Sequence, residues 1–212
     1  RRVEKGDYLL SDVERDSLKL LSRHYKKLIL ILNCGSSIDL SILEEVRLDA
    51  VLFFGQGGTE GGNALADIFT GKICPSGRLT DTWARQYADY PSAESFGHRN
   101  GDLENEDYSE GIYVGYRWFD KYQIVPRYPF GYGLSYTTFR RDVMEATHDH
   151  VTVSVTNTGD IPGKETLLLY IQKPDGRLEH EEKALAAFAK TNTLAPGESQ
   201  SITVPVDPKK IA

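Results

Sequence analysis

The residues of this 212-residue chain that could carry chemistry include a dense glycine block, Gly55 to Gly62, with the sequence GQGGTEGG. The block joins an apolar run to a helical pattern, and such a junction can bind a phosphate group at a helix N-terminus. The dinucleotide-binding pattern fails, because Glu60 stands where its third glycine is required. The P-loop pattern also fails, because no Lys-Ser/Thr pair follows the block. We therefore predict that the block is structural and binds no nucleotide cofactor.

Metal binding and nucleophilic hydrolysis find little support in the sequence. His148 and His150, two of five scattered histidines, could present imidazoles on one face of a strand, but no further ligand is spaced to complete a site. No Gly-x-Ser-x-Gly elbow occurs, which disfavours a serine hydrolase. Cys34 and Cys74 form no CxxC pair and are predicted to be free, buried side chains. The sequence thus predicts no metal site and no cofactor site.

Composition limits the classes of partner. The chain has a formal net charge of −6 and a pI near 5.4, which argues against nucleic acid or an anionic membrane as a partner. Its longest apolar runs fall short of the roughly 18 residues of a membrane-spanning helix. With 40% hydrophobic residues the chain can bury a substantial core.

The first half has the pattern of an α/β fold. Ser11 and Glu14 form a capping box, after which apolar residues recur at helical spacing. Short continuous apolar runs at 27–32 and 50–54 are typical of parallel strands covered on both faces. The further elements that we predict here are helices at 12–24 and 63–69, a helical turn at 42–46, a third strand at 78–82 and a long surface loop at 86–107.

The second half changes to a period of two residues. Val151, Val153 and Val155 alternate with small polar residues, the mark of a half-buried strand. We predict five strands, at 140–145, 151–156, 165–172, 183–190 and 200–206, separated by turn residues. A complete sandwich of this class has about seven strands. We therefore expect both ends of the chain to be cut from a longer protein.

Between these halves, residues 108–139 combine many aromatic side chains with glycines, an unusual composition that predicts a packed strap joining two folded bodies. Glu110 stands where we expect a helix to start, and helix-terminus electrostatics explains a carboxylate there. Trp83 and Trp118 could stack on a sugar ring, although packing is the favoured role for both.

Several stretches together carry a family resemblance. They are EGIYVGYRWFD and PRYPFGYGLSYTTF in the strap, GQGGTEGGNALADIFTGKICPSGRL before it, and VTVSVTNTGDIPGKETLLLYI and LAPGESQSITV after it. In sequence and in order these blocks resemble the β-glucosidase-like enzymes of glycoside hydrolase family 3, over almost the whole chain. The resemblance implies a partial α/β sandwich with a flavodoxin-like parallel sheet, followed by a fibronectin type III-like β-sandwich. It also implies three parts: α/β domain at 1–107, strap at 108–138 and β-sandwich at 139–212.

The resemblance also implies where catalysis occurs. Enzymes of this family retain configuration, with a nucleophilic Asp on a (β/α)₈ barrel and an acid/base Glu on the α/β domain. No barrel pattern is present, and the block Lys5 to Leu10 matches the one that follows the acid/base segment. With Arg1 as the tail of that segment, the catalytic Glu falls upstream of this chain. Glu4 is the competing candidate, but its spacing to Gly6 and Asp7 does not fit the motif.

We therefore assign no catalytic, cofactor or metal residue in this chain. We expect the C-terminal part of a retaining β-glycosidase that acts on β-linked glycosides and is inactive without its barrel domain. Its open sheet edges are expected to pair with the barrel domain, with another chain or with a second copy. The alternative is a carbohydrate- or protein-binding β-sandwich module without catalysis. It ranks second because Tyr170 and Phe188 are isolated aromatics on the predicted strands.

Overall fold

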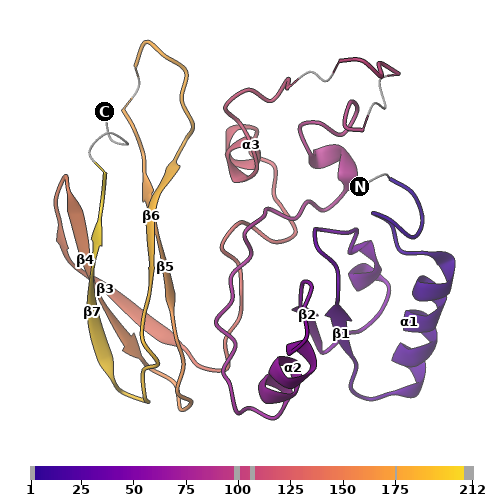
Figure 1. Ribbon diagram of the computed structural model, residues 1–212, viewed down its shortest axis with the longest axis horizontal. Helices are drawn as coiled ribbons and strands as arrows, with labels where there is room; N and C mark the ends of the chain where they lie inside the picture. Colours follow the sequence, from indigo (N-terminus) through magenta and orange to yellow (C-terminus); the bar gives the residue numbers. More distant parts are fainter. Residues whose placement is uncertain (1–2, 98–100, 106–107, 175, 208–212) are drawn as a thin grey trace. The chain divides into compact units, whose positions relative to one another are not determined.

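The structure is a computed structural model that describes residues 3–97, 101–105, 108–174 and 176–207. The chain divides into two compact units (Figure 1). The first consists of Arg1–Leu65 and Asp81–Pro129, and the second of Ala66–Thr80 and Phe130–Ala212. Each unit is thus built from two separate stretches of the chain.

The first unit begins with helix α1, Asp12–His24, whose bounds agree with the prediction. The capping box is present: the Ser11 hydroxyl accepts a hydrogen bond from the Glu14 amide, and the Glu14 carboxylate accepts one from the Ser11 amide at 2.8 Å. These bonds satisfy backbone donors that a helix start otherwise leaves unpaired. The local sequence therefore fixes where the helix begins.

Two parallel strands form the sheet of this unit. Strand β1, Ile29–Leu32, pairs with β2, Ala50–Phe53, and the 3₁₀ helix η1, Ser41–Glu44, lies between them in the sequence. Helix α2, Gly61–Phe69, follows β2 and leads from the first unit into the second. The predicted α/β class is confirmed.

The glycine block between β2 and α2 folds tightly around an aromatic ring. A Cβ atom at Gly57 would lie 2.3 Å from the Phe54 ring, and one at Gly61 would lie 2.9 Å from it. Gly55 and Gly58 have positive φ values, of 67° and 62°, which larger residues rarely adopt. Close packing and backbone conformation together account for Gly55, Gly57, Gly58 and Gly61, whereas a Cβ atom at Gly62 would meet no atom within 4 Å.

The predicted third strand at 78–82 is wrong. The stretch bonds to the strap at separate points: in the second unit the Leu79 amide donates to the Tyr132 carbonyl at 2.8 Å. In the first unit Trp83 forms an isolated bridge with Tyr128. Because its partner is an irregular strap, the stretch has no continuous ladder to join.

Among the described residues, the first unit has two further helices: η2, Tyr87–Asp89, within the predicted long loop, and α3, Tyr116–Lys121, within the strap. Helix α3 starts after Gly115, not at Glu110, so the prediction of a helix start at Glu110 is wrong. The Glu110 carbonyl instead accepts a bond from the Tyr113 amide at 2.9 Å, in a turn that precedes the helix.

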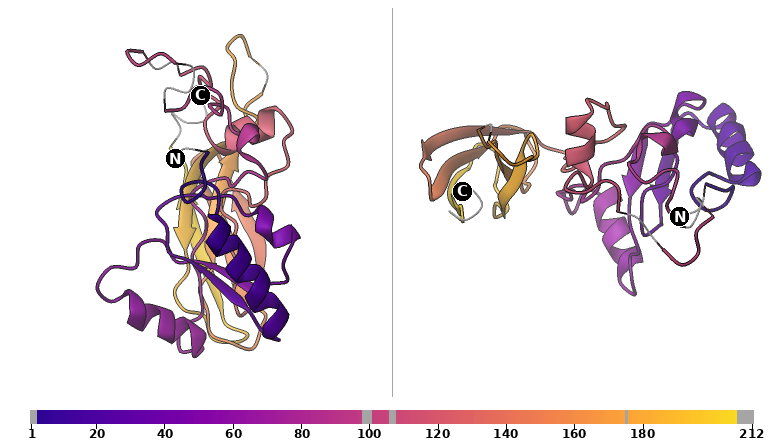
Figure 2. Two further views of the ribbon diagram at one scale, coloured as in Figure 1. Left: turned by 90° about the vertical axis from the view of Figure 1, so that its right-hand side faces the viewer. Right: turned by 90° about the horizontal axis from the view of Figure 1, so that it is seen from above.

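The second unit is a β-sandwich, whose strands appear in orange to yellow in Figures 1 and 2. One sheet is antiparallel with the order β3-β4-β7, and the other is the antiparallel pair β5-β6. All five predicted strands are confirmed: β3 Phe139–Ala146, β4 His150–Asn157, β5 Thr166–Ile171, β6 Ala184–Lys190 and β7 Ser199–Pro205. The buried core consists of Val155, Leu167, Leu194 and Val204.

The amide of Asn157 is fully buried in the second unit, at 0% exposure, and is hydrogen-bonded on both sides. Its oxygen accepts bonds from the Thr137 hydroxyl at 2.6 Å and the Gly159 amide at 3.1 Å. Its nitrogen donates to the carbonyls of Ile161 at 2.9 Å and Leu194 at 2.8 Å. One side chain therefore links the end of β4 to three neighbouring segments.

A buried ion pair network connects residues 66–80 to the same sandwich. The Glu165 side chain is 2% exposed and forms ion pairs with Arg78, at 2.8 Å, and with Arg141 on β3. At Gly133 a Cβ atom would lie 2.5 Å from the Gly77 carbonyl oxygen, so the strap approaches this stretch closely. The second unit thus includes its flanking segments as integral parts.

Candidate functional site

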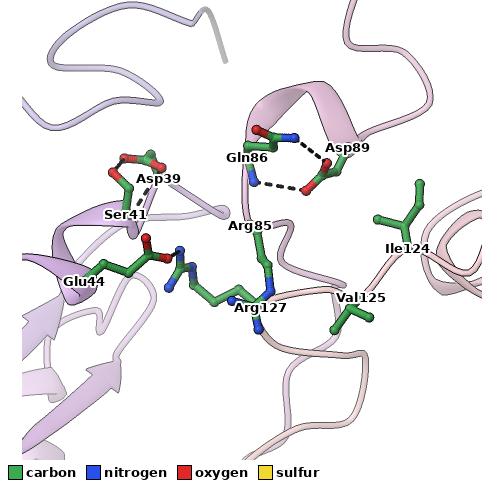
Figure 3. A pocket seen from close by; sticks show the side chains of 9 residues that line it. All are labelled: Asp39, Ser41, Glu44, Arg85, Gln86, Asp89, Ile124, Val125 and Arg127. Carbon is green, nitrogen blue, oxygen red and sulfur yellow. Dashed lines mark hydrogen bonds and ion pairs between the residues drawn. The ribbon is translucent and has the colours of Figure 1, made fainter.

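A polar pocket of about 480 Å³ lies wholly in the first unit (Figure 3). Part of its lining follows β1 in the chain, and ligand sites of α/β sheets form at the carboxyl ends of their strands. Its volume is within the range of about 300 to 1,000 Å³ that is usual for ligand pockets. The lining residues are Asp39, Ser41, Glu44, Arg85, Gln86, Asp89, Ile124, Val125 and Arg127.

The first wall of the pocket is the stretch from Asp39 to η1. Asp39 is buried at 8% exposure, and its carboxylate accepts bonds from the Ser41 hydroxyl at 2.5 Å and the Ser41 amide at 3.3 Å. This is the local side-chain bonding that favours a turn at an aspartate. The turn places Glu44, at the end of η1, on the same wall (Figure 3).

The opposite wall comes from η2 and from the strap. The Asp89 carboxylate accepts bonds from the Gln86 amide and from Gln86 Nε2, both at 3.1 Å, and so caps η2 (Figure 3). The Arg127 side chain, 9% exposed, donates to the Glu44 carboxylate at 2.7 Å. This ion pair joins residues 83 positions apart in the sequence.

The chain start is fastened beside this pocket by Tyr8, which is 3% exposed. Its ring packs edge-on against Tyr87, at a centroid distance of 5.0 Å, and against Tyr90, at 6.5 Å. The Tyr8 carbonyl accepts a bond from the Asp39 amide at 2.8 Å. Burial, first of all, and then the neighbouring Tyr90, Asp39 and Asp89 raise the pKa of the Tyr8 hydroxyl well above its usual range.

The pocket as it stands lacks a free acid/base group. Each of its three carboxylates, on Asp39, Glu44 and Asp89, already has a protein partner at hydrogen-bond distance. To protonate a glycosidic oxygen, any of them would first have to give up that partner. The polar lining of the pocket therefore suits a binding or docking site better than it suits the two carboxyl groups of a glycosidase.

The residues weighed from the sequence belong to different units, Glu4 to the first and His150 to the second. The exposed Glu4 belongs to the loop at the chain start, where its carbonyl accepts bonds from the amides of Asp7, at 3.2 Å, and Leu9, at 3.1 Å. His150, the first residue of β4 in the second unit, is held by Asp149 and Glu145, which raise its pKa. In the described part of the chain, no group of three or more His, Cys, Asp or Glu side chains is arranged to hold a metal ion.

Both tryptophans have packing roles. Trp83 is 2% exposed and packs edge-on against Phe53 at 5.2 Å, which confirms its expected packing role. Trp118 is half-buried, packs against the tilted Tyr122 ring at a centroid distance of 4.1 Å and donates to the Asp89 carbonyl at 3.1 Å. Cys34 and Cys74 are free, as predicted, but only half-buried.

Sequence reasoning missed the pocket and the role of Tyr8. The signal that could have located one wall is Asp39, a polar residue shortly after the apolar run of β1. That strand is not covered on both faces as predicted, because Ile29 and Ile31 are 46% and 37% exposed. Arg127 and Glu44 carry no such signal, because the fold alone brings them together. Tyr8 belongs to the block Lys5 to Leu10, whose resemblance to the family motif indicated the position of the catalytic Glu but gave no role to Tyr8 itself.

A parallel α/β unit followed by a fibronectin-like sandwich defines the class of the protein, and comparisons with known proteins give its family. A model described as the glycosyl hydrolase family 3 C-terminal domain matches residues 2–136. A model described as a fibronectin type III-like domain matches residues 165–212. The chain belongs to glycosyl hydrolase family 3, of which it contains the C-terminal domain and the fibronectin type III-like domain.

Relatives match nearly all of this chain but only part of their own length. Beta-glucosidase A of Butyrivibrio fibrisolvens is 40% identical, over 95% of this chain and 27% of that protein. A beta-glucosidase of Ruminococcus albus is 38% identical, over 98% of this chain and 22% of that protein. The chain thus spans about a quarter of the length of these curated relatives.

Solved structures agree with this assignment. The structure of beta-glucosidase 3B from Thermotoga neapolitana in complex with glucose superposes with a TM-score of 0.88 at 40% identity, over 97% of this chain and 30% of that one. The structure of a beta-glucosidase from Paenibacillus barengoltzii gives a TM-score of 0.87, also at 40% identity.

Among the described residues, no helix is both long and apolar enough to cross a membrane.

Proposed function

We propose that this chain is the C-terminal part of a retaining β-glycosidase of the β-glucosidase type, which hydrolyses β-linked glycosides. The observation that carries the proposal is the match of beta-glucosidases to almost the entire chain at about 40% identity. Hydrolysis with retention requires a nucleophilic carboxylate and an acid/base carboxyl about 5 Å apart. In this proposal the barrel domain supplies the nucleophile, and the residues just before Arg1 supply the acid/base Glu.

The chain itself would support the cleft and hold no catalytic group. This role is consistent with the pocket, whose carboxylates are engaged by Ser41, Gln86 and Arg127. It is also consistent with Glu4, which lies exposed in the loop at the chain start.

The test compares the chain alone with the whole enzyme on a chromogenic β-glucoside. We expect turnover from the whole enzyme and none from the chain. Glu4→Gln in the whole enzyme is expected to leave kcat within about threefold, because a general acid contributes about 10²- to 10⁴-fold. Clear hydrolysis by the isolated chain, abolished by Glu4→Gln, would overturn the placement of the acid. Polysaccharide binding without turnover by the whole enzyme would favour the alternative of a binding module.

We further propose that the sandwich unit presents sheet edges to the barrel domain or to another chain. Strand β3 is an edge of its sheet, and Val143 and Met144 on it are 68% and 66% exposed. Phe188 on β6 is 74% exposed. Exposed edges with apolar side chains are sites of strand pairing. We expect the isolated chain to self-associate in sedimentation experiments, and a stable monomer over micromolar concentrations would contradict this.

We also propose domain boundaries after residue 107, which lies outside the described residues, and after residue 138. The compact units divide the strap between them, the first ending at Pro129 and the second resuming at Phe130. Limited proteolysis tests the boundaries, because exposed linkers are cut before folded segments. Early cleavage within β4 or α1, in place of the 100–110 region, would argue against them.

A further inference from the structure

The loop at the chain start is closed by backbone hydrogen bonds, although it lies outside regular secondary structure. Within it the Gly6 amide donates to the Leu9 carbonyl at 2.8 Å, and the Leu9 amide donates to the Glu4 carbonyl at 3.1 Å. Gly6 has a φ of 86°, which a larger residue would adopt only with strain. Lys5 pairs with Asp12 in the first turn of α1 at 2.7 Å. The loop is thereby tied to the helix that follows it.

Tyr8 ties the same loop to the tyrosines of the η2 region and to the stretch that follows β1. Its ring contacts Tyr87 and Tyr90, and Tyr90 in turn contacts Phe119 of α3 at 6.0 Å. Edge-to-face aromatic pairs of this kind add about 0.5 to 1.5 kcal/mol beyond the burial of their area. The main-chain bond to Asp39 fixes the Tyr8 backbone to the stretch that follows β1. The ring contacts thus bridge three parts of the first unit that are distant in sequence.

The Tyr90 hydroxyl strengthens this anchor. It accepts a bond from the Ala84 amide at 3.1 Å and lies 3.3 Å from the Ser37 hydroxyl. Tyr90 is therefore fixed from two sides, and so is the surface against which the Tyr8 ring packs. A side chain held in a packed aromatic cluster transmits a fixed position to its neighbours in the chain.

We propose that Tyr8 is a positioning residue, which fixes the loop at the chain start against the Tyr87–Tyr90 cluster and so places the residues that precede it for catalysis. The inference rests on the proposed function, in which the acid/base Glu lies just before Arg1. Without the ring, the loop loses its contacts with Tyr87 and Tyr90, and the acid/base Glu loses its fixed distance from the scissile oxygen. A displacement of about 1 Å can lower a rate about 100-fold.

Substrates with different leaving groups respond differently to a displaced acid. In the first step the nucleophilic carboxylate bonds to C1 of the sugar, the C1–O bond breaks, and the acid gives its proton to the departing oxygen. A leaving group that is stable as an anion departs without that proton, whereas an alkoxide does not. In the second step water attacks C1, the carboxylate leaves, and the acid/base group takes up the proton of the water.

The experiment measures kcat/KM of the whole enzyme for an alkyl β-glucoside and for 2,4-dinitrophenyl β-glucoside, with Tyr8 and with Tyr8→Ala. We expect Tyr8→Ala to lower kcat/KM for the alkyl glucoside about 10- to 100-fold and that for the dinitrophenyl glucoside less than about threefold. The ratio of the two constants does not depend on the amount of folded enzyme. Partial unfolding of the variant therefore cannot produce this result.

Two further variants serve as controls. Tyr8→Phe keeps the ring and is expected to keep the ratio within about twofold. Tyr113→Ala removes another tyrosine of the first unit, 6% exposed, whose ring pairs with Tyr122, and is expected to leave the ratio unchanged. A ratio in Tyr8→Ala equal to that of the unmodified enzyme would overturn the positioning role but not the proposed function. If the unmodified enzyme hydrolyses neither glucoside, the proposed function itself fails.

Discussion

The buried amide of Asn157 makes the sharpest prediction about stability. Asn157→Ala removes the four hydrogen bonds that join β4 to Thr137, Gly159, Ile161 and Leu194. At about 1 kcal/mol for each of the four bonds, we expect a loss of about 4 kcal/mol in the free energy of unfolding. That loss is a large fraction of the stability of an ordinary domain.

Urea denaturation followed by far-UV circular dichroism measures this loss, because the affected unit is rich in strand. Thr137→Val removes one of the four bonds and is expected to cost about 1 to 2 kcal/mol. Thr158→Val is the matched control: its hydroxyl lies 2.9 Å from that of Thr138 in an exposed pair, and we expect a change within about 0.5 kcal/mol. A cost below about 1 kcal/mol for Asn157→Ala, or equal costs for the two threonine variants, would refute the reasoning.

Three more predictions follow from the packing and the charges. Gly57→Ala places a Cβ atom 2.3 Å from the Phe54 ring and should lower the free energy of unfolding by about 1 to 3 kcal/mol. Gly62→Ala, whose Cβ would meet no atom within 4 Å, should stabilise α2 by about 0.5 to 1 kcal/mol. Equal shifts of the melting temperature in the two variants would contradict this. Glu165→Gln leaves two arginines without their buried counter-charge and should cost about 3 to 5 kcal/mol in urea titrations, a prediction that unchanged midpoints would exclude. The Ser11 hydroxyl and amide lower the pKa of Glu14, so this group stabilises the fold above its usual pKa of 4.5 and loses that contribution as the pH falls through the lowered value. Ser11→Ala should therefore flatten the acid limb of a stability–pH curve and cost about 1 kcal/mol near neutrality, and an unchanged limb would count against the capping box.

The predictions that succeeded from sequence depended on local patterns. Each of these patterns determines a conformation from a few neighbouring residues. They are the capping box of Ser11 and Glu14, the apolar runs of β1 and β2, and the alternating valines of β4. The third strand failed because a strand needs a continuous partner, and the partner of Leu79 proved to be an irregular strap. The prediction of a helix start at Glu110 failed because the residue that caps α3 is Gly115, not a carboxylate.

The sequence by itself determined the family, the two kinds of fold and their order along the chain, because repeated periodicity and distinctive motifs are properties of neighbouring residues. Only the tertiary structure decided which distant groups meet. It brings Arg127 to Glu44, and Tyr8 to Tyr87 and Tyr90. It also brings Glu165 to Arg78 and Arg141. These contacts depend on the path of the whole chain. Spacing along the sequence carries no record of that path, so burial and partnership of single side chains had to be read from the fold.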